Sequence, residues 1–234
     1  FNKRRTYLLG KGLDSVMNYP FKNAVLDFVK GKPAEQAMTE ILTICEHYPA
    51  PAMDTALNFL STHDTERALT VIADEPANGR GRAWQSGRCV TGDAYEEGLL
   101  RLRMAYAIIY TLPGVPCLYY GDEIAMQGYR DPFNRAFFRW DAHEQRLRPV
   151  LAQLRHTCEA FRTGQLRVLR AEDGILHYQR VGKVETAEII VNRTEHIIVE
   201  TLASGKSTEV NPMGFTIVVE EVGHNPNHSY YDYV

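Results

Sequence analysis

The pattern of apolar residues changes once along the chain, near residue 164, and this change constrains the fold more than any other feature. Before residue 164, short apolar runs alternate with longer segments whose apolar residues recur at helical spacing. Such alternation is typical of parallel strands joined by crossover helices. After residue 164, short segments rich in β-branched residues are separated by turn signals such as Asp173-Gly174. The sequence therefore predicts an α/β region at 1–163 and an all-β domain at 164–234.

The α/β region divides into expected strands and helices with clear end signals. Strands are expected at 14–20, 56–60 and 116–120, and helices at 24–29, 33–47, 95–112 and about 147–161. Proline stands at the start of the second helix and glycine just after the first, as is common at helix ends. The segments 75–93 and 122–141 are expected to be loops. In the all-β domain, strands are expected at 168–169, 175–181, 188–191, 197–202 and 215–222.

Composition and charge argue against several classes of protein. The hydrophobic share of 44% and the charged share of 24% are ordinary for a soluble globular protein. A net charge of -3 gives no electrostatic reason to expect a nucleic-acid or membrane partner. The longest apolar run, 104–115, is shorter than the roughly 20 residues of a membrane span, and it contains Pro113 and Gly114.

The ends of the chain and its cysteines suggest a compartment. The chain carries no signal-peptide pattern and begins at Phe1 rather than methionine, which suggests a fragment or a processed product. Its 4 cysteines are widely scattered and lack metal-like spacing. In a protein of this size they indicate free thiols of a reducing compartment, with two disulfides as the alternative. A cytoplasmic location is therefore expected.

The stretch Phe59-Leu-Ser-Thr-His63-Asp64-Thr-Glu-Arg67 is the clearest candidate for chemistry, because an apolar run ends abruptly in a His-Asp pair. In a (β/α) barrel the active site lies beyond the carboxyl ends of the strands. A carboxylate there can stabilise a cationic transition state and accept hydrogen bonds from sugar hydroxyls. Alternatively, Asp64 could cap a helix that begins with the next residues. Spacing alone leaves both interpretations open.

Two further segments carry polar residues next to an expected strand end. Asp122 and Glu123 are adjacent carboxylates that could form an acid–base pair. Neighbours in a strand point to opposite faces, which favours a structural role at the barrel rim. The segment Asp131-Pro-Phe-Asn-Arg135 could present polar groups to sugar hydroxyls, with Tyr129 or Phe133 as a stacking face. An ordinary surface turn is the alternative there.

Cofactor signals are absent from the sequence. The 8 histidines show no HExxH spacing, and neither a CxxC pair nor a Gly-rich phosphate loop after a strand occurs. Arg80, Arg82 and Arg88 with Trp84 could suggest phosphate binding, but the acidic net charge favours a solvated loop. The sequence therefore predicts no metal and no nucleotide cofactor.

Together, these motifs resemble the C-terminal half of an α-amylase-family glycoside hydrolase (family 13), closest to the neopullulanase, cyclomaltodextrinase and maltogenic amylase group. Residues 13–20 resemble the family's strand six, 59–67 its strand seven, 113–123 its strand eight, and 131–135 its following substrate loop. The resemblance implies strands six to eight of a TIM (β/α)8 barrel at 1–163. It implies a small antiparallel β-sandwich, the family's domain C, at 164–234.

The resemblance also implies an activity and roles for single residues. Relatives cleave α-glucosidic bonds of maltooligosaccharides, cyclodextrins or pullulan by a retaining double displacement. Asp64 would be the third carboxylate, which stabilises the oxocarbenium-like transition state. His63, Asp131, Arg135 and Tyr19 would bind the α-glucan substrate. No cofactor is implied for this chain, although calcium binds many members of the wider family through ligands upstream.

The family's Asp nucleophile follows strand four and its Glu general acid/base follows strand five, and neither has a match in this chain. Three strands cannot close an eight-stranded barrel, so the chain alone is expected to be inactive. The full-length parent is expected to be the enzyme, and it could be a homodimer. An α-glucan transglycosylase and a non-catalytic interaction module of the same fold are the alternatives. The residues before Phe1 would separate the last of these from the hydrolase.

Overall fold

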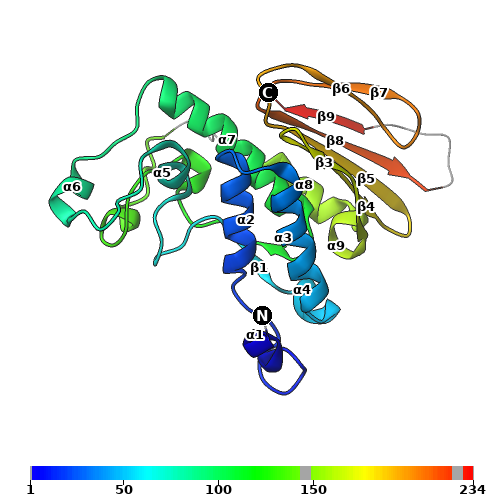
Figure 1. Cartoon of the computed structure of the whole chain (residues 1–234), viewed down its shortest axis with the longest axis horizontal. Helices are drawn as coiled ribbons and strands as arrows, with labels where there is room; N and C mark the ends of the chain where they lie inside the picture. Colours follow the sequence, from blue (N-terminus) through cyan, green and yellow to red (C-terminus); the bar gives the residue numbers. More distant parts are fainter. Residues whose placement is uncertain (1, 143–148, 223–228, 234) are drawn as a thin grey trace.

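The computed structural model describes residues 2–142, 149–222 and 229–233 (Figure 1). Helices dominate the first part of the chain, and strands form the second part. The α-helices are α1 (Asn2–Tyr7), α2 (Tyr19–Val29), α3 (Ala34–His47), α4 (Ala50–Asp54), α5 (Ala68–Ala73), α6 (Arg82–Ser86), α7 (Asp93–Thr111), α8 (Val150–Thr157) and α9 (Glu159–Thr163). Two 3-10 helices, η1 (Asp122–Ile124) and η2 (Phe133–Arg135), lie in the loop after the last parallel strand.

The parallel strands of the first part are very short. Strand β1 (Leu57–Asn58) pairs in parallel with β2 (Val115–Pro116), and Met17 forms an isolated parallel bridge to Leu57 on the other side. The three segments therefore lie side by side in chain order and run parallel, as predicted for this part of the chain. Among the described residues no further strand joins them, so the barrel is not closed.

The predicted strand lengths at 14–20, 56–60 and 116–120 are wrong. Ladder hydrogen bonds define a strand, and here they stop after one or two residues on each segment. The chain at Tyr19 instead enters α2, whose first turn contains Pro20. Asn18 and Asn58, both fully buried, join the first two segments through a side-chain hydrogen bond of 3.1 Å.

Helix α7 is the central element of the helical part, and it contacts α2, α5, α8 and the antiparallel sheet. Its inward face is apolar and almost fully buried, with Leu102, Ala105 and Ile109 among its members. Helix α5 approaches it closely at Gly98, where an added Cβ would lie 2.7 Å from the Cβ of Ala73. Glycine at this position therefore permits close packing of α5 against α7. This contact fixes α5 just after the loop at residues 59–67.

The helix predicted at about 147–161 is divided in the structure, and its first residues, 147 and 148, lie outside the described part. Cys158 has extended dihedral angles and separates α8 from α9. The carboxylate of Glu185 accepts a hydrogen bond of 2.9 Å from the Glu159 amide, so a tertiary contact starts the second helix.

The second part of the chain is antiparallel, as predicted. A five-stranded sheet has the order β3-β4-β5-β8-β9, and a separate pair joins β6 to β7. The strands are β3 (Gln165–Glu172), β4 (Ile175–Val181), β5 (Glu185–Asn192), β6 (Ile198–Thr201), β7 (Ser207–Val210), β8 (Gly214–Glu221) and β9 (Ser229–Tyr233). The β6–β7 pair lies over the larger sheet, and five buried side chains, including Ile190 and Leu202, form a small core there.

One apolar core joins the helical part to the sheet, and it includes Phe161, Leu176 and Ile217. Figure 1 shows the strands gathered beside α7, α8 and α9, with α1 projecting from the opposite part of the molecule. Buried polar groups strengthen this junction: Arg180 donates to the Thr111 carbonyl at 2.7 Å, and the hydroxyls of Thr111 and Tyr178 lie 2.6 Å apart. The sheet therefore fixes the end of α7 just before β2.

The four cysteines, Cys45, Cys89, Cys117 and Cys158, are all free. Burial raises the pKa of Cys45 to about 11 and that of Cys158 to about 12. Across the described ranges, each helix is too short or too polar to traverse a lipid bilayer.

Candidate functional site

The predicted polar residues gather beyond the carboxyl ends of β1 and β2. The guanidinium of Arg135 lies 3.7 Å from the Asp64 carboxylate and 3.0 Å from the Asp131 carboxylate. The imidazole of His63 lies 3.3 Å from Asp64, and the Arg135 Nε donates to the His63 carbonyl at 3.2 Å. Two loops that are far apart in sequence thus form one polar cluster, which we call the Asp64 cluster (His63, Asp64, Asp131 and Arg135).

The Asp64 cluster is open to solvent in this chain. The side chains of His63 and Asp64 are 61% and 62% exposed. Such exposure leaves the Asp64 side chain accessible to a ligand, but it also weakens each ion pair through solvent screening. The cluster is therefore a candidate binding surface rather than a source of stability.

Tyr19, the fifth predicted site residue, is positioned by a different contact. Its ring packs edge-on against Phe59, with ring centroids 4.9 Å apart. Phe59 directly follows β1, so Tyr19 also lies near the carboxyl end of that strand. The residue as a whole remains 36% exposed.

The helix-cap interpretation of Asp64 is wrong. Helix α5 begins at Ala68, its N-cap residue is Arg67, and no side chain caps it. Asp64 instead lies in a turn closed by two hydroxyls: the Asp64 amide donates to Thr62 Oγ1 at 3.1 Å, and the Thr62 amide donates to Thr65 Oγ1 at 3.0 Å. Because the threonines close this turn, the Asp64 carboxylate is left to face Arg135 and His63.

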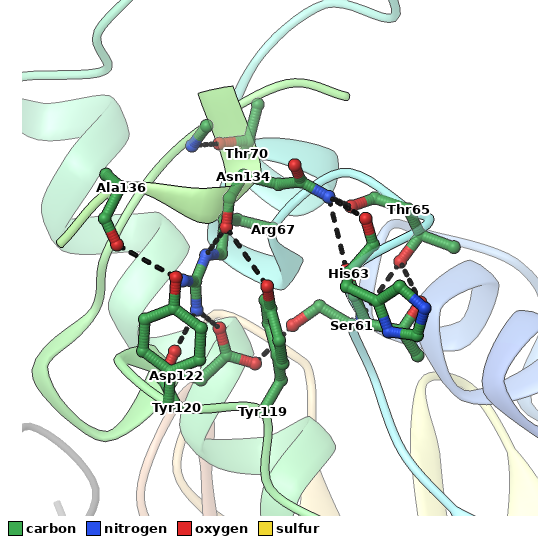
Figure 2. Close-up of polar contacts among 12 residues, drawn as sticks. Ser61, His63, Thr65, Arg67, Thr70, Tyr119, Tyr120, Asp122, Asn134 and Ala136 are labelled. Carbon is green, nitrogen blue, oxygen red and sulfur yellow. Dashed lines mark hydrogen bonds and ion pairs between the residues drawn. The ribbon is translucent and has the colours of Figure 1, made fainter. Parts of the chain in front are cut away.

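Asn134 holds the backbone of this turn from beneath. Its fully buried amide nitrogen donates to the carbonyls of His63 and Thr65, both at 2.8 Å, and to that of Thr62 at 3.3 Å. Figure 2 shows these bonds converging on the Asn134 side chain. One side chain thus links the loop after β2 to the turn that carries His63 and Asp64.

Arg67 is the buried centre of the same network, with no exposed surface. Its Nε donates to the Asn134 carbonyl at 3.0 Å, and its Nη1 pairs with Asp122 at 3.1 Å and donates to the Tyr120 carbonyl. The guanidinium also lies over the rings of Tyr119 and Tyr120, at 4.2 Å and 4.7 Å. Figure 2 shows Arg67 between the two loops that carry the Asp64 cluster.

Asp122 has the structural role that the sequence favoured. It is buried and accepts hydrogen bonds from Ser61 and, at 2.6 Å, from the hydroxyl of Tyr106. Burial raises the pKa of Asp122, while Ser61, Tyr106 and Arg67 act in the opposite direction. Its carboxylate is thus engaged by α7 and by the loop after β1, and it is not presented to a ligand.

Sequence reasoning missed Arg67 and Asn134, and it misplaced Tyr129. Both missed residues lie inside the motifs singled out, but nothing in the local pattern distinguishes a buried partner from an exposed one. Tyr129, expected as a stacking face, is only 3% exposed and donates to the Glu75 carbonyl at 2.6 Å. Burial of its ring raises the pKa of the Tyr129 hydroxyl to about 12.

The arginine-rich loop behaves as the solvated loop that was predicted. Arg80 and Arg88 lie over the ring of Trp84, at 3.9 Å and 4.8 Å, and both pair with carboxylates of Asp74 or Glu75. Burial raises the pKa of Asp74, but hydrogen bonds, from Arg88 above all, outweigh it and bring the pKa below its ordinary value. These guanidinium groups are already paired with acids, which argues against a phosphate site.

A metal site is not formed by the residues that the structure describes, since no three His, Cys, Asp or Glu side chains among them are suitably grouped. The polar groups of the candidate site are those of the Asp64 cluster. It offers carboxylate acceptors together with guanidinium and imidazole donors on one exposed surface.

Short parallel strands with polar residues beyond their carboxyl ends, followed by an antiparallel sheet, are typical of part of an α/β barrel with an appended β region. A family profile described as Alpha amylase, catalytic domain, matches residues 2–165. The chain therefore belongs to the alpha-amylase family. This confirms the resemblance to its cyclomaltodextrinase, neopullulanase and maltogenic amylase members.

Individual relatives are longer than this chain. An amylopullulanase from Thermoanaerobacter thermohydrosulfuricus is 32% identical over 192 residues, covering 74% of this chain and 12% of that protein. A cyclomaltodextrinase from Geobacillus thermopakistaniensis is 31% identical over 197 residues, covering 80% and 30%. The structure of a cyclic alpha-maltosyl-(1-->6)-maltose hydrolase from Arthrobacter globiformis has a TM-score of 0.73 at 24% identity, covering 93% and 46%, and it supports the fold. The chain thus spans less than half the length of each of these three proteins.

Proposed function

We propose that this chain forms the part of a retaining α-glucan hydrolase that binds and stabilises the reacting sugar ring. The observation that supports this most directly is the Asp64 cluster at the carboxyl ends of β1 and β2. The substrates would be maltooligosaccharides, cyclodextrins or pullulan, since membership of the alpha-amylase family supports action on α-glucosidic bonds.

Asp64 is the proposed stabiliser of the transition state. Positive charge develops at the anomeric carbon and ring oxygen as the glycosidic bond breaks. An anionic carboxylate close to that ring lowers the energy of the transition state more than that of the ground state. Arg135 and His63 orient the Asp64 carboxylate, and Asn134 fixes the backbone that presents it.

Arg135, Asp131 and His63 are the proposed ligands of the sugar hydroxyls. Arg135 supplies N–H donors in a planar fork, and Asp131 supplies acceptors 3.0 Å away. Tyr19, with its ring packed against Phe59, is proposed to border the same ring. When a sugar binds, its hydroxyls would form hydrogen bonds with Arg135 and Asp131. These bonds would replace part of the solvent-screened ion pairing between the two side chains.

The covalent steps require groups that this chain does not match. The resemblance places the nucleophile and the general acid/base after strands four and five, and the parallel segments here are strands six to eight. We therefore propose that the 234-residue chain binds α-glucans without cleaving them, and that cleavage belongs to a longer protein containing it.

Binding can be tested on the chain itself by calorimetric titration with maltoheptaose. Replacing Asp64 with Asn should weaken binding about tenfold, or ~1.4 kcal/mol. Asp54→Asn is the matched control, because Asp54 is an exposed acid at the end of α4, before β1 begins. Equal affinity of the wild-type chain and Asp64→Asn would contradict the assignment.

Cleavage can be tested with maltotriose and a cyclodextrin. The 234-residue chain should release no reducing sugar, and any sustained hydrolysis by it would refute the division of roles. In a longer protein that includes the upstream strands, Asp64→Asn should lower kcat by roughly 100-fold or more, because it removes the charge opposite the oxocarbenium-like ring. Near-normal kcat in that variant would exclude Asp64 as the stabiliser.

A further inference from the structure

Residues 76–80, Pro-Ala-Asn-Gly-Arg, form an exposed turn in the loop between α5 and α6. The Arg80 amide donates to the Ala77 carbonyl at 2.8 Å, which closes a β-turn with Asn78 and Gly79 at its two central positions. Both central residues have positive φ, 48° and 79°, as a type I′ turn requires. Figure 1 shows α6, the helix after this turn, at the outer edge of the molecule, on the far side from the antiparallel sheet.

Two groups in this turn can react with each other. Asn78 and Gly79 are both exposed, and within the part of the chain that the structure describes neither the Asn78 side chain nor the Gly79 amide forms a hydrogen bond. A Cβ placed on Gly79 would meet no atom within 4 Å, so the turn has open space around it. The amide nitrogen that follows an asparagine can attack the asparagine side chain, because a five-membered ring results. This reaction makes asparagine a thermolabile residue.

The other asparagines of the described ranges lack one or more of these features. Asn2 and Asn23 lie within helices α1 and α2, whose hydrogen bonds restrain the backbone. Asn211 precedes Pro212, whose nitrogen carries no hydrogen. Asn78 is also the one asparagine of the sequence that is followed by glycine. The remaining asparagines are fully buried and form side-chain hydrogen bonds: Asn18, Asn58, Asn134 and Asn192.

A guanidinium group is held against the turn. The Nε of Arg80 donates to the Ala77 carbonyl at 3.1 Å, and its Nη2 donates to the Pro76 carbonyl at 2.8 Å. The same guanidinium pairs with the Glu75 carboxylate at 3.0 Å. Attack on the Asn78 side chain requires loss of the proton on the Gly79 nitrogen, and it places negative charge on the side-chain oxygen. A cation held beside the turn favours both events.

We propose that Asn78 is a modification site, at which the folded chain converts asparagine to aspartate and isoaspartate through a cyclic succinimide. The deprotonated Gly79 nitrogen forms a bond to Cγ of Asn78, the bond from Cγ to the amide nitrogen breaks, and ammonia leaves with the proton. Water then opens the ring. Cleavage of the new bond gives aspartate, whereas cleavage of the original peptide bond gives isoaspartate, whose main chain runs through Cγ. Water is the single reactant consumed, and nothing is oxidised or reduced.

The turn determines how fast this reaction runs. The Gly79 nitrogen approaches Cγ after rotation about the Cα–C bond of Asn78, so the turn must open first. Two hydrogen bonds, both from Arg80 to the Ala77 carbonyl, oppose that opening. The folded chain should therefore react more slowly than the unfolded chain, but Asn78 should react before the other asparagines.

The products change the charge and the length of the loop. Either product places a new carboxylate beside Arg80, and isoaspartate also adds one carbon to the main chain of the turn. Arg80 links the turn to α6, because its carbonyl accepts a hydrogen bond of 2.9 Å from Gln85 and its guanidinium lies 3.9 Å from the Trp84 ring. Modification should therefore loosen α6. The Asp64 cluster contains no residue of this loop, so sugar binding should not change.

Incubation of the folded chain in water enriched in oxygen-18, at about pH 8, tests the proposal. Digestion with trypsin in ordinary water then releases residues 68–80 as one peptide, in which Asn78 is the single asparagine. Conversion before digestion incorporates the heavy oxygen, and conversion during digestion does not, so mass spectrometry separates the two. Synthetic peptides with aspartate or isoaspartate identify the products by chromatography. Asn78 should convert at least about tenfold faster than the other asparagines, and its rate should rise about tenfold per pH unit, because the attacking nitrogen is deprotonated.

Gly79→Ala should slow the conversion about tenfold, since a methyl group beside the nitrogen hinders both attack and backbone rotation. Gly205→Ala is the matched control, because Gly205 also has a positive φ, 83°, and open space around it. This control should leave the rate at Asn78 unchanged. Equal slowing in both variants would contradict attack by the Gly79 nitrogen.

Two further results would decide the matter. If urea-unfolded chain incorporated heavy oxygen at Asn78 while folded chain reacted there no faster than at its buried asparagines, the fold would protect the turn and the proposal would be overturned. In the incubated chain, brief trypsin treatment should cut after Arg82 and Arg88 several-fold faster than in fresh chain, with unchanged maltoheptaose affinity. Equal cutting of both samples would contradict the loosening of α6.

Discussion

The two ends of the short parallel strands use arginine in opposite ways. Before β2, the guanidinium groups of Arg155 and Arg180 are largely buried and donate to backbone carbonyls, including those of Leu112 and Thr111. Beyond β2, Arg135 is exposed and faces the carboxylates of Asp64 and Asp131. In barrels of this type, the amino-terminal face serves stability and the carboxyl-terminal face carries the site.

Burial has a measurable consequence at the first of these ends. It lowers the pKa of both Arg155 and Arg180 to about 10, although each group is still charged at neutral pH. Each can remain buried because carbonyl oxygens surround it. The Asp64 cluster, by contrast, keeps its charges in water. The comparison teaches that the buried arginines should determine stability and the exposed one should determine binding.

The largest expected effect on stability belongs to Arg67. This arginine is buried, like Arg155 and Arg180, but it supports the loops that carry the exposed Asp64 cluster. Arg67→Met leaves the Asp122 carboxylate buried without its cation, which should cost ~3–5 kcal/mol in the free energy of unfolding. Urea denaturation followed by circular dichroism measures this. The double variant Arg67→Met with Asp122→Asn is the control, and it should recover part of the loss because no unpaired charge remains. A loss under ~1 kcal/mol in the single variant would contradict the buried ion pair.

The next largest effect tests the end of the strands that we expect to serve stability, where Arg180 is buried. Arg180→Met removes the donors to the Thr111 and Gly164 carbonyls and should cost about 2–3 kcal/mol. Affinity for maltoheptaose should not change. Arg135→Ala is the matched variant, and it should weaken binding while changing the unfolding free energy by less than about 0.5 kcal/mol. If Arg180→Met weakened binding without loss of stability, and Arg135→Ala destabilised the chain without loss of binding, the proposed roles of the two strand ends would be disproved.

Asn134→Ala should modestly lower both the free energy of unfolding and the affinity for maltoheptaose. The carbonyls of His63 and Thr65 lose their donor, which should cost about 1–3 kcal/mol of stability. The turn carrying Asp64 should also become looser, so maltoheptaose binding should weaken several-fold. Hydrogen exchange at residues 61–66 should speed up in this variant. Unchanged exchange there would show that the threonine hydroxyls alone hold the turn.

The smallest expected effect concerns pH and the sheet. Burial raises the pKa of Glu188, but hydrogen bonds from His177, Gln179 and the Ala203 amide together bring it below its ordinary value. The stabilisation that the ionised Glu188 carboxylate gives to the folded chain is therefore complete above its unfolded pKa of about 4.3. It is lost as the pH falls through the lower pKa that Glu188 has in the folded chain. Glu188→Gln should show a flatter decline of unfolding free energy than the wild-type chain between about pH 5 and pH 3. Parallel curves would exclude Glu188 as a source of acid sensitivity.

Much of the fold could be predicted because periodicity and end signals are local. Helices α3 and α7 are long, strongly patterned and bounded by proline or glycine, and they were predicted within a few residues. Helices α4, α5 and α6 have only five or six residues, too few for a periodic pattern to show. The β9 strand was missed because its polar and aromatic sequence gives no alternation, and pairing with β8 defines it.

The site was predictable only in its exposed part. His63, Asp64, Asp131 and Arg135 stand in short motifs, and their proximity follows from two neighbouring strand ends. Arg67 and Asn134 are 67 residues apart, and their contact exists only in the folded chain. No local pattern distinguishes a buried arginine from an exposed one, so the support beneath the site could not be read from the sequence.

The most direct test of the account is a hydrogen-exchange map of the chain with and without maltoheptaose. We expect slower exchange at amides of residues 61–67 and 131–136, where the Asp64 cluster lies. Amides of β3, β4 and β5, around the buried Arg180, should be unchanged. Protection confined to the sheet, or its absence from residues 61–67 under saturating sugar, would contradict the assignment of the carboxyl ends of β1 and β2 as the substrate site.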